Sequence, residues 1–238
     1  MNYIIGKHAI SEVLKHNPYR IKKVLCVRSK DPLLIELQKR GILVQFVDKQ
    51  YLTHIVRTDS HQSFIAIVTP RKISSLADII KKSQKEATTR FVILDSITDP
   101  HNFGSILRAA ECFGMNGVIW SKNRSPGITP VVTKVSSGAS ELLSLIEVSN
   151  LSQTTQQLAS YGYTILSTGL SLGPSESVFS FSFPQKGVLI LGSEGKGVQK
   201  ILQAKADYNI HIPIRGKISS LNVAQAAAVI FSFWSMRL

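Results

Sequence analysis

The sequence predicts an α/β protein with two units, a small N-terminal α/β unit and a larger C-terminal unit that contains a mostly parallel sheet. Three observations lead to this prediction. The chain has 238 residues, enough for two domains of ordinary size. Hydrophobic residues make up 44% of it and charged residues 18%, a balance that supports buried cores. From residue 90 onward, short apolar runs alternate with segments of helical spacing, which is typical of parallel strands joined by helices.

The first unit is expected to span residues 1–70. Residues 9–16 have helical spacing, and Asp31-Pro32 is typical of a helix start, so a second helix should run to about residue 40. A third helix is expected at 49–56, and apolar runs predict strands at 21–27, 43–47 and 64–68. Residues 71–89 are rich in Lys, Ser and Thr, and we interpret them as a linker containing one short helix.

The second unit is expected to span residues 90–238. Its first strand, 91–94, is a continuous apolar run, as expected of a strand that is buried on both faces. Further strands are expected at 117–120, 164–167, 187–191 and 210–214. Helices are expected at 105–113, 153–160 and 223–237, and a helical stretch should begin at 129–136, with residues 142–148 following it.

The charge of the chain favours a polyanionic partner. There are 28 Lys and Arg against 15 Asp and Glu, a formal net charge of +13, which favours nucleic acid because phosphate contacts release counterions. No lipidation signal or basic amphipathic helix favours a membrane. Cys26 and Cys112 form no CxxC pair, so a metal or redox site is not expected. Without a signal-peptide pattern or a long apolar run, the protein is expected to be cytoplasmic.

Three turns rich in small or polar residues follow predicted strands, at residues 95–108, 192–197 and 212–223. Asn102 could cap a helix that starts near it, and glycines around Glu194 would let the backbone approach a ligand. Taken singly, each turn has a plain structural explanation as a cap, a turn or a solvated loop. In open α/β sheets, however, ligands bind beyond the carboxyl ends of strands, so the three turns together predict one composite site.

Taken in order, these turns resemble the signature motifs of the SpoU family of RNA ribose methyltransferases, within the SPOUT superfamily. The matching segments are DPHNFGSILR (99–108), GSEGKG (192–197) and IPIRGKISSLNV (212–223). In the first unit, GKHAI (6–10) and His61-Gln62 resemble the small substrate-binding domain of the bacterial subfamily that methylates guanosine 2′-hydroxyls in 23S ribosomal RNA. That domain is similar to a ribosomal-protein RNA-binding fold.

The resemblance implies a SPOUT domain with a deep trefoil knot, S-adenosylmethionine as methyl donor, RNA as substrate, no metal, and a homodimer that buries the apolar helix at 226–234. The residues implied to contact the donor are Thr168, Gly169, Gly192, Ile212 and Leu221. The implied catalytic residue is Arg108, with Asn102, Glu194, Ser220 and Asn222 orienting it and the ribose. A guanidinium is a poor base because it keeps its proton at neutral pH. Arg108 is therefore expected either to take the hydroxyl proton or to hold the RNA phosphate and stabilise the developing alkoxide.

Two positions depart from the family pattern, and other functions stay open. Ser63 stands where relatives usually have glycine after His-Gln, and Thr133 stands where an arginine is common. A tRNA ribose methyltransferase is an alternative within the class, although the extra N-terminal unit argues against it. A non-catalytic RNA-binding factor in ribosome assembly is another. A nucleotide-binding dehydrogenase is disfavoured because no GxGxxG follows the first strand of the second unit.

Overall fold

The computed structural model describes residues 2–169 and 174–236, and its contacts divide the chain into two compact units. Unit 1 comprises Met1–Lys72 together with Ile128–Leu142. Unit 2 comprises Ile73–Gly127 and Leu143–Leu238. The chain therefore crosses between the units three times, because a segment from the middle of the sequence packs with the N-terminal elements. No helix in the described part is long and apolar enough to cross a membrane.

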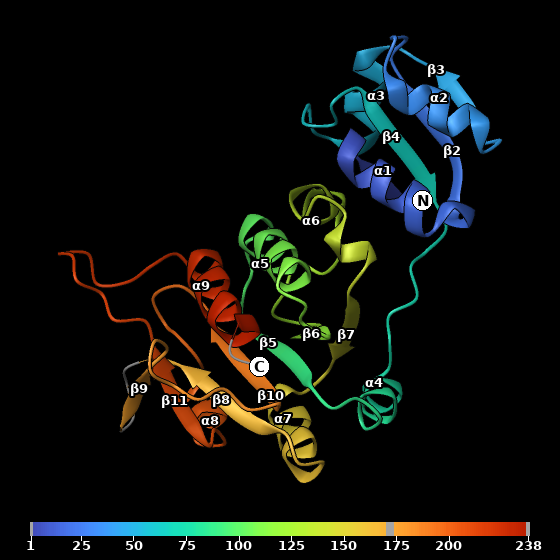
Figure 1. The fold of residues 1–238 in the computed structure, drawn as a ribbon. Coiled ribbons are helices and arrows are strands. Elements are labelled where there is room, and N and C mark those ends of the chain that lie inside the picture. The colour runs from blue at the N-terminus through green and yellow to red at the C-terminus, as the bar shows by residue number, and fades with distance from the viewer. Residues whose placement is uncertain (1, 170–173, 237–238) are drawn as a thin grey trace. The chain divides into compact units, whose positions relative to one another are not determined.

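Unit 1 is a four-stranded mixed sheet with helices on both faces (Figure 1). The strands lie in the order β1-β4-β2-β3, antiparallel except for the β2–β3 pair. One core contains buried residues of α1 and α2, and another contains Leu52 of α3. The elements are β1 (Asn2–Ile5), α1 (Lys7–His16), β2 (Ile21–Cys26), α2 (Pro32–Lys39), β3 (Val44–Phe46), α3 (Lys49–Val56) and β4 (Phe64–Val68). The expected helices and strands of this region are all present, and β1 is an additional strand.

The segment Ile128–Leu142 completes unit 1 with the short helices α6 (Pro130–Val135) and η2 (Ala139–Glu141). Glu141 forms a buried ion pair with Arg20, whose guanidinium also donates to the Thr69 carbonyl. Gly138 has a φ of +89°, and a Cβ there would lie 2.7 Å from the Cβ of Glu12. A buried charge pair and a close approach that only glycine permits therefore hold this segment against the N-terminal helices.

Unit 2 contains a seven-stranded sheet in the order β7-β6-β5-β10-β8-β11-β9, and every neighbouring pair is parallel. This confirms the predicted α/β class with a parallel sheet. The strands are β5 (Thr89–Asp95), β6 (Gly117–Ser121), β7 (Ser144–Val148), β8 (Thr164–Thr168), β9 (Ser175–Ser177), β10 (Lys186–Gly192) and β11 (Tyr208–His211). The helices are α4 (Leu76–Ser83), α5 (Pro100–Cys112), α7 (Leu151–Ser160), α8 (Lys200–Gln203) and α9 (Val223–Met236).

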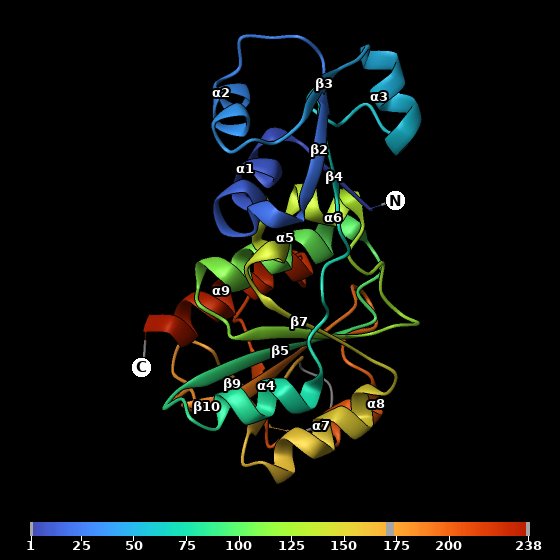
Figure 2. The same cartoon turned by 90° about the vertical axis from the view of Figure 1, so that its right-hand side faces the viewer.

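Helices cover both faces of this sheet (Figure 2). On one face, α4, α7 and α8 pack over alternate strand residues such as Phe91 and Ile93. On the other face, α5 and α9 pack against each other. The indole N–H of Trp234 donates to the Pro184 carbonyl at 3.0 Å, and its ring would meet any Cβ at Gly187 at 2.8 Å. Helix α9 is thus already packed within its own chain.

Several expected boundaries were wrong. Helix α5 begins at Pro100, because Asp99 caps it by accepting from the backbone N–H groups of His101 and Asn102. Asn102 therefore lies inside the first turn and is not the cap. Residues 144–148 form a strand where no strand was expected. The last expected strand, 210–214, ends at residue 211 in β11, shortly before a proline that has no N–H to donate. The expected end of the last helix at residue 237 lies outside the described residues.

Candidate active site

The loops that carry the three sequence motifs leave the same edge of the unit 2 sheet. Strands β5, β10, β8 and β11 are consecutive in the sheet and parallel, so their carboxyl ends meet there. The register pairs Gly192 with Asp95, Ile190 with Ser167, and Ile210 with Thr168. The turn before α5, the glycine-rich loop after β10 and the loop after β11 therefore gather at one place, as the composite-site prediction requires.

A hydrogen-bonded cluster joins the three loops through Asn102, Glu194 and Asn222. The side-chain amide of Asn102 donates to Glu194 Oε1 at 3.1 Å. The amide of Asn222 donates to the same oxygen at 2.6 Å and to Asn102 Oδ1 at 2.9 Å. One residue comes from each motif, so we call this trio the Asn–Glu–Asn cluster. Residues separated by about 90 and 120 positions in sequence thus form one polar network.

The backbone sets the orientation of both asparagines. Asn222 Oδ1 accepts from the N–H of Ala224 at 2.9 Å and caps α9, so its amide nitrogen must point toward the other two side chains. Asn102 is held in the first turn of α5 by its own N–H, which donates to Asp99 Oδ2 at 3.1 Å. Helix capping, which was the plain explanation for Asn222, is therefore what aims its amide into the cluster.

The glycine loop, residues 192–197, presents Glu194 from a tight turn. Gly197 N–H donates to the Ser193 carbonyl at 2.9 Å, and Gly195 and Gly197 have φ values of +80° and +66°. A Cβ at Gly192 would lie 2.0 Å from the carbonyl carbon of Gly197. The loop folds back on itself so closely that residue 192 must be glycine, whatever else binds there.

Two of the expected catalytic residues lie outside the cluster. Arg108 is exposed and makes no hydrogen bond or ion pair with any residue that the structure describes. It follows Asn102 by six helical residues, which is an advance of about 9 Å and a rotation of about 240° along α5. Ser220 is exposed in the loop before α9. The structure thus brings together three of the five residues assigned to catalysis.

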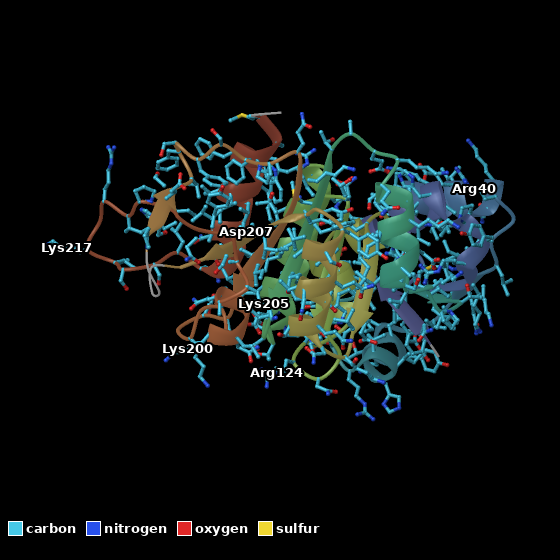
Figure 3. All side chains as sticks on the ribbon, turned by 90° about the horizontal axis from the view of Figure 1, so that it is seen from below. Arg40, Arg124, Lys200, Lys205, Asp207 and Lys217 are labelled. Carbon is cyan, nitrogen blue, oxygen red and sulfur yellow. The ribbon has the colours of Figure 1, made fainter. Side chains whose placement is uncertain are left out.

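The residues assigned to donor binding surround the same edge. Thr168 Oγ1 donates to the Ile190 carbonyl at 3.1 Å, and Gly169 N–H donates to the Ile210 carbonyl at 3.3 Å. Ile212 is half-buried, and Leu221 is 40% exposed. Partly exposed aliphatic side chains at this edge can contact the apolar part of a ligand. Figure 3 shows Lys217 at the outer end of the loop after β11.

Unit 1 contains a separate polar feature around His61, which is fully buried. Its Nδ1 accepts from the N–H of Ser63 at 3.0 Å, so its Nε2 carries the proton and donates to Thr53 Oγ1 at 3.1 Å. The Thr53 hydroxyl in turn donates to Asp59 at 2.8 Å. A hollow of about 440 Å³ above this relay is lined by Lys49, Gln50, Thr53, His54 and Asp59.

Comparisons with known proteins agree with the motifs. The sequence model of the SpoU rRNA Methylase family matches residues 89–232, and that of the RNA 2′-O ribose methyltransferase substrate binding family matches residues 3–74. The 23S rRNA (guanosine-2′-O-)-methyltransferase RlmB of Pasteurella multocida is 34% identical over 231 residues, covering 95% of this chain and 94% of that protein. The putative TrmH family tRNA/rRNA methyltransferase YacO of Bacillus subtilis is 34% identical over 234 residues, with 96% and 93% coverage.

Solved structures share the fold, several of them over nearly the full length of this chain. The SpoU methyltransferase AviRb of Streptomyces viridochromogenes, in complex with AdoMet, superposes with a TM-score of 0.82 at 22% identity, covering 99% of this chain and 89% of that one. An AdoMet-bound rRNA methyltransferase of Sinorhizobium meliloti gives 0.80 at 22% identity, with 100% and 87% coverage. The TrmH/SpoU tRNA modifying enzyme of A. aeolicus covers only 68% of this chain and 83% of its own, with a TM-score of 0.57 at 21% identity.

Proposed function

The chain belongs to the SpoU rRNA methylase family, and from this premise we propose that it transfers a methyl group from S-adenosylmethionine to a ribose 2′-hydroxyl of RNA. The observation that carries the proposal is the Asn–Glu–Asn cluster, which joins one residue of each family motif at the carboxyl edge of the sheet. A family resemblance in sequence would be compatible with scattered motif residues. Hydrogen bonds among all three motifs indicate that they form one site.

The proposed substrate is a guanosine of 23S ribosomal RNA. Relatives that carry this activity in their names align with 95% of the chain, so unit 1 is part of the shared length. The formal net charge of +13 favours a polyanion. Unit 1 is proposed to bind the RNA, consistent with the substrate-binding family that matches residues 3–74. Such a substrate places the enzyme in the cytoplasm.

The proposed reaction moves a methyl group from sulfur to oxygen. The ribose 2′-oxygen forms a bond to the methyl carbon while the carbon–sulfur bond breaks, and its electron pair stays on sulfur, which departs as a neutral thioether. The hydroxyl proton passes to Arg108 or to water. S-adenosylmethionine, when bound, supplies an electrophilic methyl group on a sulfonium, so no metal is needed to activate it. Gly192, Ile212 and Leu221 are proposed to contact the donor, and Thr168 and Gly169 to line its adenosine pocket. Positioning of donor and hydroxyl should supply much of the acceleration.

Arg108 is proposed to act on the hydroxyl, with the Asn–Glu–Asn cluster and Ser220 positioning the ribose. A guanidinium binds an RNA phosphate or a developing alkoxide strongly, because it carries a permanent charge and several donors. Since Arg108 lies apart from the cluster of its own chain, we propose that the site is completed in a homodimer. Arg108 would then act across or beside the subunit interface. The partly exposed side chains of α9, such as Ala226 and Val229, would contribute to that interface.

A deep trefoil knot at the carboxyl edge is part of the same proposal. Strand β10 lies between β5 and β8, although β8 precedes it in the chain. After β11 the chain returns, and α9 packs against α5, the helix that follows β5. A chain that inserts a strand between two earlier ones and then crosses back has the connectivity that such a knot requires, in contrast to ordinary unthreaded folds.

The test is methyl transfer from labelled S-adenosylmethionine to ribosomal RNA prepared from a strain that lacks the protein, with the modified nucleotide mapped. Label at one guanosine 2′-hydroxyl of 23S RNA is the expected result. Label in tRNA alone would keep the chemistry and overturn the substrate. Tight RNA binding without any label would overturn the proposed activity and would indicate a non-catalytic factor in ribosome assembly. Light scattering of the purified protein, which should give twice the mass of 26.2 kDa, tests the dimer.

A further inference from the structure

Asp95, the last residue of β5, is a fully buried carboxylate beside the proposed donor site. Its Oδ2 accepts from the backbone N–H of Gln199 at 2.7 Å. Its Oδ1 accepts from the side-chain amide of Gln199 and from the Ser96 hydroxyl at 3.0 Å. It has no ion pair with the described residues, so these donors alone offset the cost of burying its charge.

Gln199 connects this carboxylate to the end of the glycine loop. It stands two residues after Gly197 and immediately before α8. Arg124 donates to its Oε1, which fixes the amide so that its nitrogen faces Asp95. Figure 3 shows Arg124 and Lys200 at this end of the unit. On the other side, Ser96 has a φ of +59° and begins the turn that leads to α5. Asp95 therefore touches both of the segments that supply Asn102 and Glu194.

We propose that Asp95 and Gln199 form a latch that holds the glycine loop in its donor-binding conformation. The latch makes Asp95 a positioning residue, because a carboxylate with no exposed surface and with donors on both oxygens cannot reach the ligand. The loop contains three glycines, and only its first residue belongs to β10, so its conformation depends on contacts outside the strand. The bond from Gly197 N–H to the Ser193 carbonyl and the buried Val198 supply some of these contacts. The latch adds a hydrogen-bonded anchor at Gln199, so donor binding has less of the loop to order. This inference rests on the proposed function.

The test exchanges the two interacting groups. In Asp95→Asn, an amide nitrogen meets either the N–H or the amide of Gln199, so one donor faces another. In Gln199→Glu, two carboxylates face each other in a buried place. In the double variant Asp95→Asn/Gln199→Glu, the new amide oxygen accepts from the backbone N–H at position 199 while its nitrogen donates to the new carboxylate. Arg124 then faces a carboxylate as well. The hydrogen bond between the two side chains is restored, with residue 95 now the donor and residue 199 the acceptor.

The control is Asn116→Asp. Asn116 lies directly before β6 and bonds to Arg90 near the start of β5, the strand that ends at Asp95. Asn116 accepts from the N–H of Arg90 at 2.8 Å and donates to Glu86 at 3.0 Å. The substitution therefore also places one carboxylate against another, about 17 Å from the latch by the rise of the five residues from Arg90 to Asp95. All variants are studied in the full-length protein by calorimetric titration with S-adenosylmethionine and by thermal unfolding.

Each single latch variant should weaken donor binding about tenfold or more, the effect of losing one charge-assisted hydrogen bond. The double variant should return to within about threefold of the wild type, and Asn116→Asp should keep wild-type affinity at a similar loss of thermal stability. Unchanged affinity in the single variants, or a double variant no better than the worse single one, overturns the latch. Failure of the wild-type protein to bind the donor would overturn the proposed function itself, and the latch with it.

Discussion

Replacing Glu141 by Gln should destabilise unit 1 far more than the loss of one surface charge. The side chains of Arg20 and Glu141 are only 9% and 3% exposed. Glu141 also acts on a second guanidinium. Burial lowers the pKa of Arg71, the nearby Glu141 raises it, and Arg20 lowers it further. Without the carboxylate, the buried Arg20 and the half-buried Arg71 remain as two positive charges near each other.

The expected loss is about 3 kcal/mol, the lower end of the range for leaving one member of a buried ion pair without its partner. The retained hydrogen bonds from Arg20 to the Thr69 carbonyl argue against a larger value. The matched control is Glu12→Gln in the same unit, where Glu12 pairs with Lys15 at the surface and the two side chains are 27% and 55% exposed. Such surface pairs contribute about 0–1 kcal/mol. The two substitutions remove the same group and differ in burial.

Urea unfolding combined with hydrogen exchange is the appropriate assay, because a protein of two units need not unfold in one step. In Glu141→Gln, exchange should rise in Ile128–Leu142 and in the strands β1 and β4, while the strands of unit 2 keep their protection. A loss of stability no larger than that of Glu12→Gln would refute the argument. So would a loss spread evenly over both units.

Four further outcomes are expected. Arg108→Ala should lower methyl transfer about 100-fold or more with unchanged calorimetric donor affinity, and full activity would remove its assigned role. Leu221→Ala should weaken donor binding about fivefold at unchanged thermal stability, since the exposed side chain has little packing to lose. Ser63→Gly should raise the unfolding free energy of unit 1 by about 1 kcal/mol, because Ser63 has a φ of +64°. A lower unfolding free energy in urea unfolding would contradict this. Burial lowers the pKa of His61, so as the pH falls the imidazole is protonated in the unfolded chain before it is protonated in the folded one. Urea titrations should therefore show unit 1 losing stability as the pH falls below about 6.5, and His61→Gln should abolish this dependence.

The sequence predicted elements best where one pattern determines both ends. Helix α3 and strand β4 match the expected ranges 49–56 and 64–68, because polar turns bound their apolar pattern on both sides. The start of α5 was placed too late because the Asp99-Pro100 start signal was passed over in favour of Asn102. Strand β9 has the sequence Ser-Glu-Ser, which carries no strand signal. It exists because β11 pairs with it, a tertiary contact that no local pattern contains.

Only part of the site could be predicted from the sequence. Motif order identified Asn102, Glu194 and Asn222, and the parallel sheet explains why they meet. The spacing of Arg108 along α5 could have shown that it points away from Asn102, since six helical residues do not return to the same face. Asp95 and Gln199 were not singled out, because an aspartate at a strand end and a glutamine before a short helix are common. Only their pairing across the sheet edge makes them notable.

Gly192 shows why motif residues alone do not separate the demands of folding from those of ligand binding. It is assigned to donor contact, yet its side-chain position is already filled by the backbone of Gly197. Any substitution there would displace the glycine loop and weaken donor binding, whether or not the donor touches residue 192. Leu221→Ala only removes atoms, from a side chain that is 40% exposed. Loss of donor affinity in that variant, at preserved stability, is therefore evidence about the ligand, whereas the same loss in a Gly192 variant or a latch variant is evidence about the loop.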